Sequence, residues 1–276
     1  MKTALLQLNV SDDPAENLVV TLDLVRRAAE EGATFILTPE VTNCISSSRE
    51  QQQRVIRHEE EDDTFAALCA QAANLNVWIL IGSLALKAEG ADDRLENRSV
   101  LVGPDGNVVA RYDKIHMFDV QVSKTETYKE SASFRPGTKA VLARTPFANI
   151  GMTICYDVRF PHLYRALAQA GAEILTVPAA FSAVTGKAHW HSLLRARAIE
   201  NGCFVLAPAQ TGTHKGAHKT PRKTYGHSLV VSPWGEVLMD AGEAPGFSVI
   251  DLDLQEVAQA RQKIASLTHD RDYDAP

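Results

Sequence analysis

The amino-acid sequence predicts an α/β fold in which two mixed β-sheets lie face to face and helices cover their outer sides. Short apolar runs alternate with helix-like segments along the chain, and two pairs of runs are joined by tight turns. The run at 77–82 is apolar on both faces, so a strand there needs cover on both sides. Strict alternation of strand and helix would predict one parallel sheet, whereas interleaved hairpins favour mixed sheets.

The first third of the chain begins with a strand and a helix. Residues 3–10 are expected to form the strand. Asp13, Pro14 and Glu16 then provide a helix cap, a first helical residue and an acidic first turn. This helix is expected to end at Gly32, because glycine commonly follows the last helical residue. The next expected elements are a strand at 34–37, a helix at 62–74 and a strand at 77–82.

A hairpin follows, with strands at 99–102 and 108–112 around the turn residues 103–107. Pro161 suits a first helical position, and Gly202 closes a longer helix. The remaining expected elements are strands at 149–155, 173–178, 203–208 and 247–251, helices at 161–170 and 187–201, and a second hairpin at 227–232 and 236–239. No linker rich in proline, glycine or serine divides the chain, so we expect one domain over residues 1–276.

The composition narrows the class of protein. The chain has 276 residues, of which 45% are hydrophobic and 22% charged, which suffices for one large core. Its formal net charge is −6, and the only basic tract is short, at 214–223, so a nucleic-acid partner is not expected and a small-molecule partner is favoured.

The expected location is the cytoplasm. The first ten residues contain too short an apolar run for a secretory signal, and no run reaches the roughly 18 apolar residues of a membrane helix. The four cysteines are widely spaced, which fits free thiols in a reducing compartment: Cys44, Cys69, Cys155 and Cys203.

Cys155 lies where an expected strand meets an expected helix. The apolar run 149–154 precedes it and Pro161 begins the helix. A helix N-terminus or a nearby cation can lower the pKa of a thiol, so we expect an acidified thiol there. On its own, a lone cysteine at the end of a buried strand is more often a small apolar core residue.

Glu40 and Lys114 also follow expected strands. In open α/β arrangements the carboxyl ends of strands gather into one crevice, so Glu40, Lys114 and Cys155 can meet although they are distant in sequence. Taken singly, a glutamate or lysine after a strand is usually an exposed surface residue. The three together make a candidate site.

Three segments carry a family resemblance: residues 37–40, 112–119 and 151–161. Their order and context resemble the Glu, Lys and Cys triad of the nitrilase superfamily of carbon-nitrogen hydrolases. Further segments extend the resemblance over nearly the whole chain: 130–131, 135–137, 185–190, 194–200, 225–228 and 232–236. The resemblance implies a four-layer αββα sandwich, a homodimer packed through helices, and neither a metal nor an organic cofactor.

The resemblance also implies a mechanism. Glu40 would take the proton of Cys155, whose thiolate attacks an amide carbonyl and forms a thioester that water then hydrolyses. Lys114 and the backbone N–H of Tyr156 would stabilise the oxyanion. Glu130 matches a second glutamate of the family, which would position Lys114 and the substrate.

Substrate expectations follow from the same resemblance. Arg159 matches a position that holds a substrate carboxylate, and its forked donors suit that role. Phe181 and Thr185 match pocket-wall positions. The chain is most similar to the branch of deaminated-glutathione amidases and omega-amidases, and residues 207–214 favour the first. That reaction gives 2-oxoglutarate and cysteinylglycine.

Other activities stay open. An omega-amidase would act on 2-oxoglutaramate or 2-oxosuccinamate, and the same triad serves hydrolysis of N-carbamoyl amino acids or nitriles. A non-catalytic scaffold is a different class, against which the intact set of Glu40, Lys114, Cys155 and Glu130 argues. The basic stretch 215–223 is either a lid that meets an anionic substrate or an ordinary solvated loop.

Three further kinds of site are not expected. A papain-like pair of Cys155 and His162 would leave Glu40 and Lys114 unexplained. The acidic stretch 59–63 suits a first helical turn better than a calcium loop. The histidines do not form a convincing zinc-binding set: His189, His191, His214, His218 and His227.

Overall fold

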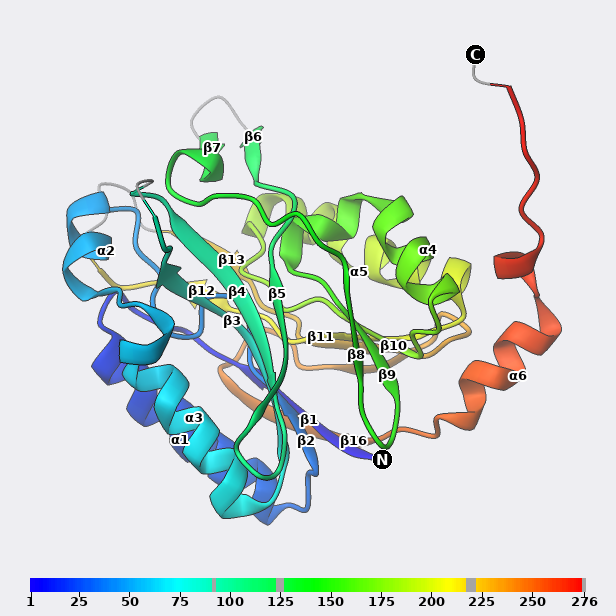
Figure 1. Ribbon diagram of the computed structural model, residues 1–276, viewed down its shortest axis with the longest axis horizontal. Coiled ribbons are helices and arrows are strands. Elements are labelled where there is room, and N and C mark those ends of the chain that lie inside the picture. The colour runs from blue at the N-terminus through cyan, green and yellow to red at the C-terminus, as the bar shows by residue number, and fades with distance from the viewer. Residues whose placement is uncertain (91–92, 123–126, 217–221, 275–276) are drawn as a thin grey trace.

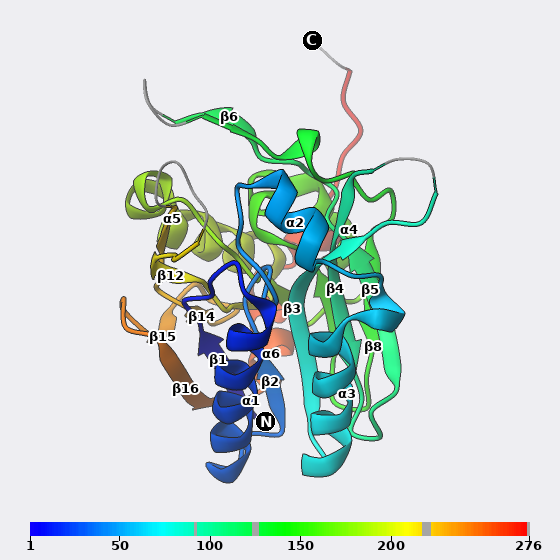
Figure 2. The ribbon, with the colours of Figure 1, turned by 90° about the vertical axis from the view of Figure 1, so that its left-hand side faces the viewer.

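The computed structural model describes residues 1–90, 93–122, 127–216 and 222–274 and contains two six-stranded mixed sheets. The sheets pack face to face, with helices on both outer sides (Figures 1 and 2). The strand orders are β16-β1-β2-β3-β4-β5 in the first sheet and β15-β14-β11-β10-β9-β8 in the second. The predicted four-layer αββα arrangement is therefore confirmed.

The first sheet contains β1 (Lys2–Gln7), β2 (Phe35–Leu37), β3 (Trp78–Lys87), β4 (Leu95–Val102), β5 (Val108–Asp113) and β16 (Gly246–Asp251). The second contains β8 (Val141–Arg144), β9 (Asn149–Met152), β10 (Ile174–Thr176), β11 (Phe204–Ala207), β14 (Leu229–Val231) and β15 (Val237–Asp240). In each sheet three central strands are parallel and the others are antiparallel. Both predicted hairpins are present, as β4 with β5 and β14 with β15.

The helices form the outer layers. Helices α1 (Pro14–Glu30) and α3 (Asp63–Leu75) lie side by side over the first sheet (Figure 2). Helices α4 (Pro161–Gln169) and α5 (Ala183–Asn201) cover the second sheet. The Asp13 carboxylate accepts the Ala15 N–H at 2.9 Å, as the predicted cap requires. None of the helices in these ranges offers an apolar stretch that would span a bilayer.

Alternation along the strands of the first sheet separates two parts of the core. Leu5, Leu37 and Leu80 belong to the cluster shared with the second sheet. Their neighbours Ile36 and Ile79 belong to the cluster under α1 and α3. All five side chains are fully buried, and each such burial contributes about 1.5–3 kcal/mol of transfer free energy. Both faces of the central strands are thus covered, as the apolar run at 77–82 predicts.

Several elements differ from the prediction. Helix α5 begins at Ala183, four residues before the expected start at 187. Gly186 disfavours a helix intrinsically, but a Cβ there would lie 2.3 Å from the Tyr225 ring, so close packing requires glycine at this point of the helix.

Several short elements were not predicted. Most of them are polar: α2 (Arg49–Val55), α6 (Gln255–Lys263), β6 (Asp119–Gln121), β7 (Thr127–Lys129), β12 (Thr211–Thr213) and β13 (Lys223–Tyr225). Strand β8 was also not predicted. The nine residues of α6 bury only Val257 and Ala260, which leaves too weak an apolar period to detect.

Candidate active site

The strand ends bring four predicted residues to one cavity. Glu40 follows β2, Lys114 follows β5 and Cys155 follows β9, while Glu130 opens a short turn after β7. All four line a cavity of about 300 Å³. The candidate site therefore sits at the carboxyl ends of strands, as the sequence indicates.

Lys114 is a buried cation between two carboxylates. Its side chain is 2% exposed, and its Nζ lies 2.8 Å from Glu40 Oε1 and 2.8 and 2.9 Å from the two oxygens of Glu130. Burial alone would lower the pKa of Lys114, but the charges of Glu130 and Glu40 outweigh it and raise the pKa above 10.5. Lys114 therefore remains an ammonium donor at neutral pH.

Glu40 is held by both of its carboxylate oxygens. Oε1 accepts from Lys114 and from Asn97 Nδ2 at 2.9 Å, and Oε2 accepts the Ala180 N–H at 2.7 Å. Burial alone would raise the pKa of Glu40, but the Lys114 charge and hydrogen bonds from Lys114, the Cys155 thiol and Ala180 keep it below 4.5. Glu40 is therefore an ionised carboxylate that can accept a proton from the Cys155 thiol.

Cys155 begins a 3₁₀ turn, Cys155–Arg159, in a left-handed conformation with φ of 48°. Its N–H donates to Pro178 O at 2.9 Å. Burial, and then the charge of Glu40, raise the pKa of the thiol well above 9.0, and the Lys114 charge does not compensate. The expectation of an acidified thiol is wrong, because the thiol is buried beside a carboxylate and α4 begins only at Pro161. Ionisation of this thiol requires a base.

Of the expected substrate-binding residues, Phe181 lines the cavity, as does Tyr156, the expected oxyanion donor. The Tyr156 N–H belongs to the first turn of the 3₁₀ segment, where backbone donors have no partner within the helix. Arg159 is not among the lining residues. Its guanidinium lies 5.9 Å from the ring centre of Tyr156 and 5.5 Å from that of Phe181, two residues that do line the cavity.

Thr185 also lies away from the described lining, on the first turn of α5, and its buried hydroxyl has no hydrogen-bond partner within the ranges that the structure covers. The stretch 215–223, for which a lid and a solvated loop were the two alternatives, falls mostly outside the described residues, since 217–221 are not among them.

Asn97 and Arg222 are among the lining residues that were not predicted as site residues. Asn97 is 2% exposed, and its Nδ2 donates to Glu40 at 2.9 Å and, at 3.4 Å, to Glu130. Asn97 precedes the expected strand at 99–102 and stands between Glu96 and Arg98, so the apolar pattern does not point to it. Arg222 lines the cavity and donates to Ala180 O at 3.2 Å. It belongs to the basic stretch that the sequence singles out.

A buried network fixes the turn after Cys155. The Asp157 carboxylate accepts from the Tyr112 hydroxyl at 2.6 Å, the His116 N–H at 3.1 Å and the Ile154 N–H at 2.9 Å. The His116 ring stacks on Phe160 with their centres 3.5 Å apart. This network spans the residues that flank Lys114 and Cys155.

The alternative of a papain-like pair finds no support. His162 is exposed on α4, and its ring contacts Phe160 and His116. A cysteine, a glutamate and a lysine gathered at the strand ends of an αββα sandwich instead define the nitrilase-type class of hydrolases. The carbon-nitrogen hydrolase family model matches residues 2–262, and the chain belongs to this family.

Comparisons with individual proteins agree with the family. The chain is 40% identical to a deaminated glutathione amidase of Synechocystis over 268 residues, which are 96% of each protein. It is 34% identical to an omega-amidase of Bos taurus, covering 98% of this chain and 95% of the relative. Its structure is similar to that of the C. elegans NitFhit protein, with a TM-score of 0.88 and 32% identity over 98% of this chain and 65% of the other.

Proposed function

We propose that this protein is an amidase that hydrolyses deaminated glutathione through a thioester on Cys155. The observation that carries the proposal is the buried set of Cys155, Glu40 and Lys114 at the cavity. The name of the Synechocystis relative, which is 40% identical over nearly the whole chain, supports the choice of substrate.

The first half of the reaction forms the acyl enzyme. Glu40 accepts the proton of the Cys155 thiol, and the sulfur attacks the amide carbonyl carbon. Because the thiol has a raised pKa, proton removal accompanies attack and the thiolate does not accumulate beforehand. Glu40 then gives the proton to the nitrogen, the C–N bond breaks, and cysteinylglycine leaves with its amine.

The oxyanion of the tetrahedral intermediate needs donors that are already in place. The Lys114 ammonium and the Tyr156 N–H are proposed to supply them. Glu130 binds Lys114 through both carboxylate oxygens and accepts the Phe118 N–H at 2.6 Å. It is therefore proposed to hold the ammonium in position for the reaction.

The second half removes the acyl group. Water, activated by Glu40, attacks the thioester carbonyl, and the C–S bond breaks. The products are 2-oxoglutarate and the free Cys155 thiol, which recovers its proton. No redox step or additional co-reactant is required.

Recognition of the substrate carboxylates is assigned to the arginines. Arg222 lines the cavity, and a guanidinium binds both oxygens of a carboxylate. Arg159, which the family resemblance assigns to a carboxylate, packs against the rings of Tyr156 and Phe181 in the cavity wall. The cavity, at about 300 Å³, is at the lower end of the range for small-molecule sites.

We also expect a homodimer packed through the outer helices, with α5 a suitable face because Val184 and Ile199 are exposed on it. A cytoplasmic location fits the four free cysteines. Light scattering of the purified protein tests the dimer, and a monomer at micromolar concentration would contradict it.

The assay that tests the proposed function compares deaminated glutathione with 2-oxoglutaramate, an N-carbamoyl amino acid and a nitrile. We expect the highest kcat/KM for deaminated glutathione, and complete loss of turnover in Cys155→Ala. Cys69→Ala, which changes a cysteine outside the cavity lining, is the matched control. Near-normal turnover by Cys155→Ala would refute the mechanism, and a higher kcat/KM for 2-oxoglutaramate would identify an omega-amidase.

A further inference from the structure

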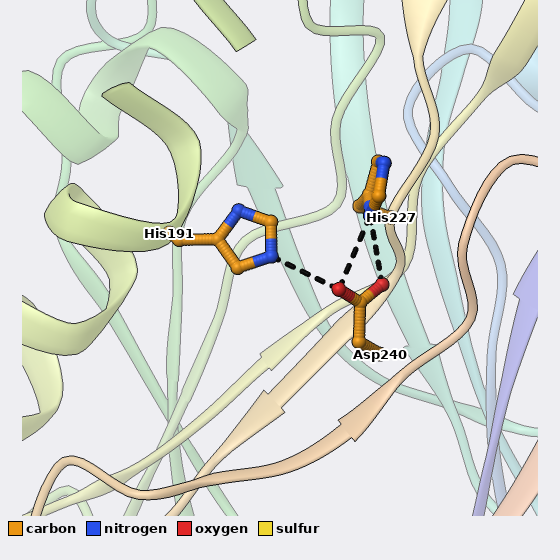
Figure 3. Close-up of side chains that lie close together, drawn as sticks. All are labelled: His191, His227 and Asp240. Carbon is orange, nitrogen blue, oxygen red and sulfur yellow. Dashed lines mark hydrogen bonds and ion pairs between the residues drawn. The ribbon is translucent and has the colours of Figure 1, made fainter. Parts of the chain in front are cut away.

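Two of the histidines meet at a site outside the cavity lining. His191 lies on α5, His227 lies between β13 and β14, and Asp240 ends β15. Figure 3 shows the three side chains pointing toward one another from these three segments. Spacing along the sequence does not reveal this cluster, because its third member is an aspartate from another element.

The donor atoms are close enough to share one ion. His191 Nε2 lies 3.0 Å from Asp240 Oδ2, and His227 Nδ1 lies 2.9 and 3.1 Å from Asp240 Oδ1 and Oδ2. One donor atom from each residue falls within 4.8 Å of the others. Donors bound to one zinc ion at 2.0–2.1 Å are about 2.9–3.4 Å apart, so small side-chain rotations would complete the geometry.

The surrounding structure holds these side chains in place. His227 has a left-handed backbone with φ of 54°. Two hydrogen bonds maintain it: the His227 N–H donates to Gly242 O at 2.7 Å, and Trp190 Nε1 donates to the His227 carbonyl at 2.8 Å. The Tyr225 ring stacks on the His227 ring at 4.4 Å. The Gly242 N–H donates to Asp240 Oδ1 at 2.9 Å. Such outer contacts orient metal ligands in known sites.

We propose that His191, His227 and Asp240 form a binding site for a late first-row divalent ion such as Zn²⁺. Two imidazoles and one carboxylate suit zinc, copper or nickel better than magnesium or calcium, which prefer oxygen donors. The three side chains are 35%, 20% and 34% exposed, so an ion reaches them from solvent and a water completes its coordination.

The ion would connect three segments that are distant in sequence. It joins α5 to the turn before β14 and to the end of β15, and α5 follows directly on Phe181 in the cavity wall. An ion that binds the folded chain more tightly than the unfolded chain stabilises the fold. This inference concerns stability and does not depend on the proposed amidase activity.

The test measures zinc bound to the chelator-treated full-length protein by equilibrium dialysis against ZnCl₂. All proteins carry Cys155→Ala, so that zinc cannot bind the active-site thiol. We expect one zinc per chain to be lost in His191→Ala, His227→Asn and Asp240→Asn. Asparagine is chosen at 227 because it tolerates the left-handed backbone. His189→Ala, an exposed position on the same helix, is the matched control and should retain that zinc.

A second measurement uses the unfolding temperature. Zinc should raise Tm of the parent and of His189→Ala by several degrees, about 2–4 °C per kcal/mol of binding, and leave Tm of the three site variants unchanged. Equal zinc uptake by parent and site variants, or no uptake by the parent, would overturn the proposal and leave a purely hydrogen-bonded cluster. His191→Ala alone decides the question if the other variants fold poorly, because the His191 side chain is 35% exposed.

Discussion

The Tyr112 hydroxyl donates a 2.6 Å hydrogen bond to the Asp157 carboxylate, and both side chains are fully buried. Tyr112 lies two residues before Lys114, and Asp157 lies two residues after Cys155. This one bond therefore fixes the end of β5 relative to the turn that presents the thiol.

Removing this bond should lower both stability and turnover. Tyr112→Phe leaves one Asp157 oxygen with fewer donors, at an expected cost of about 1–3 kcal/mol in urea-induced unfolding. We expect kcat to fall while KM changes little, because Lys114 and Cys155 lose their relative position. Tyr273→Phe, at an 89% exposed position, is the control. An unchanged kcat in Tyr112→Phe would show that the bond does not position the site.

The thiol pKa predicts how Cys155 responds to alkylation. The Glu40 charge and its hydrogen bond raise the thiol pKa, so Glu40→Gln should move the pH midpoint of iodoacetamide alkylation downward while turnover is lost. Glu130→Gln should move it less, because Glu130 is a smaller cause of the shift. Mass spectrometry of the modified cysteine measures both. An upward shift in Glu40→Gln would contradict the assigned cause.

Loss of Lys114 should show a characteristic dependence on pH. The pKa of Glu40 is lowered, so its contribution to stability is present above 4.5 and disappears as pH falls below that value. The pKa of Lys114 is raised, so its contribution is present below 10.5 and disappears as pH rises further. Lys114→Met should thus be less stable by about 3–5 kcal/mol between about pH 5 and pH 10, with a smaller deficit near pH 3.

Unfolding by urea at several pH values checks this. Lys139→Met, an exposed lysine, should show no such window. A deficit that is the same at pH values near 3 and 7 would mean that lost packing, not charge pairing, causes the effect.

Gly82 supports the loop that carries Glu40. Its N–H donates to Thr38 Oγ1 at 2.9 Å, and a Cβ at this position would lie 1.9 Å from Thr38 O. Gly82→Ala should therefore displace the loop and reduce stability and turnover together. Gly103→Ala, where the nearest atom at 2.9 Å is the end of the Asp105 side chain, should be tolerated. Thermal unfolding and the amidase assay compare the two, and equal tolerance would show that β3 can move away from the loop.

The two arginines should differ in their effect on the substrate. Arg222→Ala should raise KM for deaminated glutathione by about 10-fold or more and leave a short uncharged amide unaffected, because a charged hydrogen bond contributes about 1.5–3 kcal/mol. Arg159→Ala should have a smaller effect, since it meets the cavity through two aromatic rings. The opposite order would make Arg159 the direct carboxylate ligand.

The sequence predicts which residues follow the strands and so lie at the candidate site. It does not predict properties that depend on the surroundings of a side chain in the folded protein. Glu40, Lys114 and Cys155 were predicted because each follows an expected strand and because the surrounding segments resemble one family. The direction of the thiol pKa was not, because burial beside Glu40 is a property of the assembled site. The predicted start of helix α5 was four residues too late, because the low helix propensity of Gly186 argued against a helix there, whereas packing against Tyr225 requires glycine.

The histidine pair shows the same limit. His191 and His227 are far apart in sequence, and their common partner is an acidic residue at the end of a strand. Spacing rules for metal sites depend on local patterns, so they do not detect a cluster of three side chains from three separate elements.

The raised pKa of Cys155 has a consequence for the lifetime of the protein. Peroxide and other cellular oxidants react with thiolates, and a neutral thiol is converted to sulfenic acid slowly. If Cys155 loses its proton only as it attacks an acyl group, as proposed, we expect slow oxidation of the thiol between turnovers. We expect the purified protein to keep its activity in air without added reductant.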